Sequence, residues 1–208
     1  MRNRFTSSYI DGPIGSTMLR TACSMLAGTL AISGYNIADT WFVSSLGTDQ
    51  LAAMGFTFPV IMLIGCVFRG LGVGVMTNAA QALGSGNNTK AGKLITSGLL
   101  LIFLVSIFFA VAGIQCIEST FALFGANAEV MPDIRAYMTT WYLGCCTASL
   151  GMAGNDLLIA AGDSKIASFM MMCGMILNVI FDPLFIMGFG PIPAMGIKGA
   201  AIATVAGQ

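Results

Sequence analysis

The chain has few charged residues and no histidine. Only 9% of its 208 residues are charged, whereas a soluble domain has about 25%, and 56% are hydrophobic. Because so few charges cannot cover the surface of a soluble protein of this size, the composition predicts that lipid covers much of it. The formal net charge is zero, which leaves no basic surface for nucleic acid. The absence of histidine removes the commonest general base and metal ligand.

The cysteines form no CxxC pair and lie almost entirely in apolar runs. This placement favours small packing residues over a disulfide framework or a zinc site. No nucleophile–base pair or metal cluster is visible either, so we expect neither an enzyme nor a cofactor. The six positions are Cys23, Cys66, Cys116, Cys145, Cys146 and Cys173.

Apolar segments long enough to span a bilayer recur along the chain, and charged residues separate them. They predict an all-α membrane protein with a cytoplasmic amino-terminal segment, 1–14, and a transmembrane lobe, 15–208. We place its helices at about 15–46, 51–84, 92–117, 134–161 and 165–189, with a sixth, 195–208, that is cut off at Gln208.

Basic residues suggest which way the chain crosses the membrane. Arg2 and Arg4 precede the first helix, Lys90 and Lys93 lie between the second and third, and Lys165 lies between the fourth and fifth. These three places share one face if each segment spans. Because positive residues accumulate on the cytoplasmic side, we expect a cytoplasmic amino terminus in a multi-pass plasma-membrane protein.

Glycines and aromatic residues suggest how the helices pack. Gly70 and Gly74, four apart in GLGVG, predict a point where two helices approach closely. Aromatic residues near the helix ends predict a belt at the outer interface, formed by Trp41, Phe42, Tyr137, Trp141 and Tyr142.

Two acids lie at matching depths inside apolar helices. Asp39 and Asp182 each precede the expected outer end of their helix by seven residues, which puts both roughly 10 Å below that end. Asn178 precedes Asp182 by four and shares its helix face. Thr204 reaches a similar depth in the sixth helix. An ionised carboxylate in the membrane costs roughly 2.5–3.5 kcal/mol, so such a cluster predicts a functional site.

Prolines add a further polar feature. Pro183 cannot donate a hydrogen bond to the carbonyl of Val179, so it predicts a kink and a free oxygen beside the acids; Pro59 predicts a second kink. Tyr35 and Asn36 add polar atoms one turn below Asp39, and we expect them to line a cavity inside the lobe. Oxygen atoms suit a hard cation such as sodium, whereas a proton could neutralise the carboxylates instead. The residues leave both ions open.

Several stretches together resemble a known family, the multidrug and toxic compound extrusion (MATE) transporters of the DinF-like branch. NVIFDPLFIMGFGPIPAMGIKGAAIATVAGQ (178–208) is similar to its fifth and sixth helices, and YNIADTWFVSSLGTDQLAAMGFTFP (35–59) to its first helix and outer loop. AAQALGSGNNTKAGK (79–93) and NDLLIAAGDSK (155–165) resemble its cytoplasmic turns. The similarity covers nearly the whole chain, in order.

The resemblance implies a twelve-helix antiporter made of two six-helix lobes. Inward flow of sodium ions or protons would drive the export of small amphipathic or cationic compounds. This chain would be the amino-terminal lobe with a truncated sixth helix, and its partner would be a missing carboxy-terminal lobe. The family's cation site falls on Asp39, Asn178, Asp182 and Thr204, so sodium, if it is the ion, would bind there.

Three residues depart from the family pattern or from the site. Ile159 stands where such families often place an arginine. Arg69 lies mid-helix where the family is usually apolar, and we expect it to line the cavity, to snorkel or to pair with another polar group. Asp156 lies at a different level from the acidic cluster, which favours a gate or a packing contact.

Two other functions remain open on the sequence. A lipid-linked oligosaccharide flippase of the same superfamily would present more cationic residues toward a large cavity. A non-transporting membrane scaffold would have no reason to align acids at one depth. The sequence identifies neither the exported compound nor the coupling ion.

Overall fold

The computed structural model describes residues 14–188 and 193–207, and its regular structure is helical throughout this part of the chain. Helices α3 to α6 are long and apolar enough to cross a membrane, and α2 has 31 residues. The predicted all-α membrane fold is therefore confirmed. The helices are α2 (Ile14–Ser44), α3 (Thr48–Gly84), α4 (Asn88–Leu123), α5 (Met131–Ala160), α6 (Ser164–Ile186) and α7 (Ile197–Ala206).

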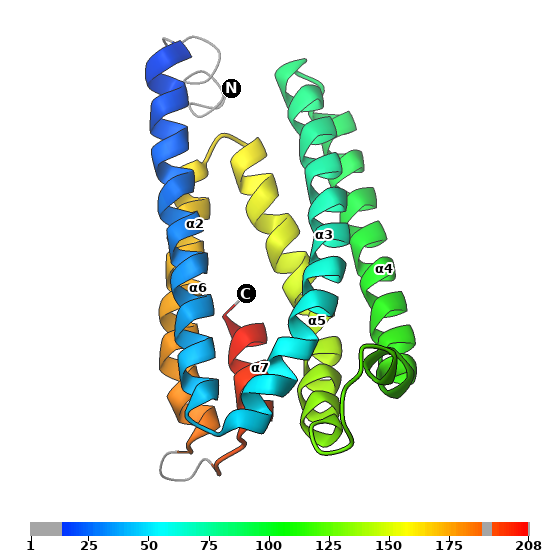
Figure 1. Ribbon diagram of the computed structural model, residues 1–208. Coiled ribbons are helices and arrows are strands. Elements are labelled where there is room, and N and C mark those ends of the chain that lie inside the picture. Colours follow the sequence, from blue (N-terminus) through cyan, green and yellow to red (C-terminus); the bar gives the residue numbers. More distant parts are fainter. Residues whose placement is uncertain (1–13, 189–192, 208) are drawn as a thin grey trace.

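Short links make successive helices run in opposite directions, as Figure 1 shows. Gly86 and Gly162 adopt positive φ angles of 77° and 91° just after α3 and α5, a conformation in which glycine commonly ends a helix. The next helices begin with side-chain caps. Asn87 accepts a hydrogen bond from the backbone N–H of Lys90 at 3.0 Å, and Asp163 accepts one from Ile166 at 3.2 Å.

The helices form two packed groups. Helix α2 lies along α6, while α3, α4 and α5 pack on one another, and α7 packs against both α5 and α6 (Figure 1). This arrangement places α2, α6 and α7 side by side, so polar residues from three distant parts of the sequence can meet there.

The predicted aromatic belt is only partly correct. Trp41 is 65% exposed, as an interfacial residue should be. Tyr137, Trp141 and Tyr142 are instead buried in the core beside large side chains such as Phe121. Their stretch of α5 faces α3 and α4 rather than the surroundings, because α5 packs on both helices.

The predicted close approach at Gly70 and Gly74 is wrong, because nothing lies within 4 Å of the place where a β-carbon would stand at either. Other glycines provide the tight contacts. The ring of Tyr142 on α5 fills the space above Gly113 on α4. Helices α6 and α7 meet through Gly207, where a β-carbon would stand 2.9 Å from Cβ of Asn178.

Candidate cation site

The two acids predicted from their matching depths are both buried on packed helices. Asp39 on α2 is 2% exposed and Asp182 on α6 is fully buried. Helices α2 and α6 lie along each other, and the two carboxylates interact electrostatically. Both helices end earlier than predicted. Asp39 lies five residues before the end of α2 at Ser44, and Asp182 lies four residues before the end of α6 at Ile186. Both acids thus remain at one level, about 6–8 Å from the helix ends.

The amide and the hydroxyl of the predicted cluster are buried as well. Asn178, one turn before Asp182, is 1% exposed, and Thr204 on α7 is 7% exposed. Gly207, one turn beyond Thr204, brings the backbone of α7 against Asn178. The hydroxyl of Thr204 donates a hydrogen bond to the carbonyl oxygen of Ala200 at 2.9 Å, so its own oxygen can still accept a hydrogen bond or ligate a cation.

Five buried polar atoms of the two acids and Asn178 have no hydrogen-bond partner. They are Oδ1 of Asp39, both carboxylate oxygens of Asp182, and Oδ1 and Nδ2 of Asn178. In the described part of the chain, the only other such buried side-chain atom is Oδ1 of Asn155. Burying an ionised group without a partner is strongly unfavourable, so the cluster fits a positive species between its oxygens.

The donor chemistry suits a hard cation or a proton. Two carboxylates, an amide oxygen and a hydroxyl are all oxygen donors, which sodium prefers. Among the described residues, no three or more His, Cys, Asp and Glu side chains gather as a transition metal would require. The six cysteines are free thiols. The roles of Asp39, Asn178, Asp182 and Thr204 in cation binding stay predictions.

Both prolines lie inside helices. Pro183 directly follows Asp182, and α6 continues past it to Ile186, where the backbone N–H of Met187 donates to the Pro183 carbonyl at 3.1 Å. Pro59 lies in the first third of α3, and Figure 1 shows the first turns of α3 inclined to the rest. The side chains of Tyr35 and Asn36, predicted to line the cavity, lie outside the described residues.

A second pair of charges, which the sequence analysis did not connect, lies on α3 and α5. Arg69 is exposed and Asp156 is half-buried. The two side chains interact electrostatically, although their charged atoms are more than 4.0 Å apart. An Asp156 oxygen lies 2.7 Å from where a β-carbon of Gly72 would stand, so the carboxylate occupies the space that this glycine leaves.

The fold defines a multi-pass helical membrane protein with two acids buried between its helices. The MatE family model matches residues 25–184, and the chain belongs to the MatE family. This confirms the family that the motifs predicted, whereas its DinF-like branch stays a prediction.

Three similar proteins illustrate the relationship. The chain is 41% identical to a protein named FAD transporter from Shewanella oneidensis, over 94% of this chain and 43% of that protein. It is 28% identical to the Probable multidrug resistance protein YoeA of Bacillus subtilis, over 77% of this chain and 35% of that protein. An outward-facing multidrug resistance MATE family transporter superposes with a TM-score of 0.84 at 31% identity, over 92% of this chain and 42% of that one. The chain thus spans less than half the length of these proteins.

Proposed function

We propose that the chain is the amino-terminal lobe of a secondary transporter that exports small molecules across the plasma membrane in exchange for sodium ions or protons. The observation that carries this proposal is the buried pair Asp39 and Asp182, in which three of the four carboxylate oxygens are buried without a hydrogen-bond partner. Such a pair has little structural value in an apolar bundle, and ionisable groups inside membranes usually mark ion pathways.

The chain's own residues suggest how the ion would act. Asp39 and Asp182 would contribute carboxylate oxygens, and Asn178 and Thr204 would contribute neutral oxygens. A bound sodium ion or proton would neutralise the charge between α2 and α6 and allow the helices to approach. Bending of α2, or of α6 at Pro183, would then displace the cargo from the lobe.

Two kinds of cargo have support. Amphipathic or cationic drugs fit the family resemblance and the multidrug name of YoeA. FAD, an anionic nucleotide, is favoured by the name of the relative that shares 41% identity over nearly the whole chain. The two differ in the sign of their charge, so matched efflux measurements separate them.

Basic residues at one end of the bundle support an orientation in the membrane. Lys90 and Lys93 lie in the first turns of α4 and Lys165 in that of α6, at the end where α2 begins. This asymmetry supports a cytoplasmic amino terminus. Because the chain spans less than half the length of its relatives, a second lobe would complete the transporter.

Efflux from vesicles tests the proposal. Vesicles containing the complete two-lobed transporter, with this chain as its amino-terminal lobe, are loaded with ethidium or with FAD, and a sodium or proton gradient is imposed. We expect ion-driven efflux of one cargo by the unchanged protein, and none by Asp39→Asn or Asp182→Asn despite normal membrane insertion. Glu129→Gln, in the exposed α4–α5 link, is the matched control and should export normally. Unchanged efflux by both aspartate variants would refute the assignment.

A further inference from the structure

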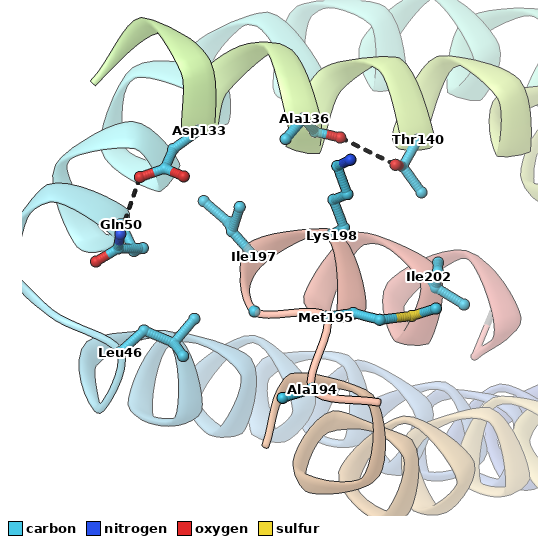
Figure 2. Close-up of a pocket in the computed structure, with 11 residues that line it drawn as sticks. Leu46, Gln50, Asp133, Ala136, Thr140, Ala194, Met195, Ile197, Lys198 and Ile202 are labelled. Atoms are coloured by element: carbon cyan, nitrogen blue, oxygen red, sulfur yellow. Dashed lines mark hydrogen bonds between the residues drawn. The ribbon is translucent and has the colours of Figure 1, made fainter. Parts of the chain in front are cut away.

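A separate pocket lies where α2 ends and α3, α5 and α7 begin (Figure 2). Its volume is about 600 Å³, within the range of about 300–1,000 Å³ that small-molecule sites occupy. Much of its wall is apolar and includes Leu46, Ile197 and Ile202. The pocket therefore has the size and the apolar surface that a compact organic ligand requires.

The pocket also contains one carboxylate and one ammonium group. Asp133 lies in the first turn of α5 and Lys198 in the first turn of α7, and Figure 2 shows Lys198 extending toward α5. Asp133 accepts a hydrogen bond on Oδ2 from the Nε2 of Gln50 at 2.9 Å. Across residues 14–188 and 193–207, the only ion pair within 4.0 Å joins Arg135 to Glu118, so Asp133 and Lys198 do not neutralise each other directly.

The two charged groups lie at different points along one wall. Asp133, Ala136 and Thr140 follow one face of α5, since residues three, four and seven apart align on a helix. Their stripe is about 10 Å long. The hydroxyl of Thr140 donates to the Ala136 carbonyl at 2.9 Å, and Lys198 approaches this end of the stripe in Figure 2. A ligand with an anionic group and a cationic group could contact both residues at once.

The position along the bundle indicates where such a ligand comes from. The pocket lies at the helix ends, nearer the end of the bundle than Asp39. Its residue Leu46 follows Asp39 by seven positions, or about 10 Å along the helix direction. The same end of the bundle carries the exposed Arg135–Glu118 pair. Charged side chains mark the level of the lipid headgroups, where apolar helix surface meets polar headgroups and water.

We propose that this pocket binds a zwitterion that carries a phosphate and a primary ammonium group, supplied as the headgroup of phosphatidylethanolamine. The phosphate contacts the ammonium group of Lys198, and the ligand's ammonium group donates to the Asp133 oxygen that Gln50 leaves free. The apolar wall at Leu46 and Ile202 lies against the glycerol and the first acyl carbons. This assignment does not depend on the proposed transport function.

Lipid titration tests the assignment. The purified chain in detergent is titrated with dioctanoyl phosphatidylethanolamine, phosphatidylcholine and phosphatidylglycerol, and bound lipid is counted by native mass spectrometry. We expect phosphatidylethanolamine to bind about tenfold more tightly than the other two, because a trimethylammonium group cannot donate a hydrogen bond and glycerol carries no charge. Equal binding of the three lipids would overturn the proposal.

Variants assign the contacts. Asp133→Asn, which keeps an acceptor for Gln50, should remove the preference for phosphatidylethanolamine over phosphatidylglycerol. Lys198→Gln should weaken the binding of all three lipids. Glu118→Gln, which breaks the exposed ion pair at the same end, is the matched control and should bind like the unchanged chain. If Asp133→Asn retains the preference for phosphatidylethanolamine, Asp133 does not bind the ammonium group and the proposal fails.

Soluble phosphoethanolamine distinguishes the two sources of this chemistry. If binding requires the acyl chains, the site is supported and its ligand is the lipid. If phosphoethanolamine binds with the same affinity and the same dependence on Asp133, the zwitterion site is supported with a soluble ligand. If neither form binds, the site is refuted.

Discussion

Replacing Asp182 by asparagine should stabilise the chain in sodium-free buffer at alkaline pH. Asp182 is fully buried and neither carboxylate oxygen has a hydrogen-bond partner. An ionised carboxylate inside the membrane costs about 2.5–3.5 kcal/mol. A buried neutral amide costs about 1 kcal/mol. The difference, about 2 kcal/mol, corresponds to a rise in melting temperature of about 4–8 °C for a chain of this size.

If sodium is the coupling ion, adding it should raise the melting temperature of the unchanged chain above that of Asp182→Asn. A cation at a hundred times its dissociation constant stabilises the folded state by about 2.7 kcal/mol. The unchanged chain should therefore melt higher as sodium replaces choline, whereas Asp182→Asn should not respond. If protons are the coupling ion, acidification should stabilise the unchanged chain more than the variant.

Thermal unfolding in detergent, followed by the fluorescence of Trp41 and Trp141, measures both effects. Glu129→Gln controls for the loss of one acid at an exposed position. The reasoning is refuted if Asp182→Asn melts below the unchanged chain in sodium-free alkaline buffer. It is also refuted if sodium and acid stabilise the variant and the unchanged chain equally.

Two further predictions concern packing and charge outside the cation site. Gly113→Ala should destabilise the chain by about 1–3 kcal/mol because its methyl group meets the Tyr142 ring, whereas Gly70→Ala should not destabilise it and should add up to about 1 kcal/mol of helix stability; thermal unfolding compares them. Arg69→Gln and Asp156→Asn should show a coupling free energy of about 0.5–1 kcal/mol in a double-mutant cycle of unfolding, and additive effects would contradict the interaction between α3 and α5.

Much of the candidate cation site could be predicted from the sequence because it depends on local spacing. Asn178 and Asp182 share a helix face by their separation of four, and depth along a helix follows from counting residues. The same counting placed Asp39 and Thr204 at nearby levels. The fold class followed from composition and from the length of the apolar runs, since few structures can satisfy the backbone in lipid.

Other features could not be predicted because they depend on how helices pack. Gly70 and Gly113 are equally plausible contact points in sequence, and only the facing helix decides which one is used. Arg69 and Asp156 interact because α5 ends beside the middle of α3, which no local spacing encodes. The pocket around Lys198 likewise combines three segments that lie far apart in the chain.

Infrared difference spectroscopy of the purified chain tests most directly whether Asp39 and Asp182 are neutralised by a small positive species. Spectra are recorded as sodium replaces choline and, separately, as the pH is lowered. We expect carboxylate bands to shift with sodium, or a protonated-carboxyl band to appear with acid, and we expect that signal to be lost in both Asp39→Asn and Asp182→Asn. Signals in both variants that match those of the unchanged chain would contradict the cation site.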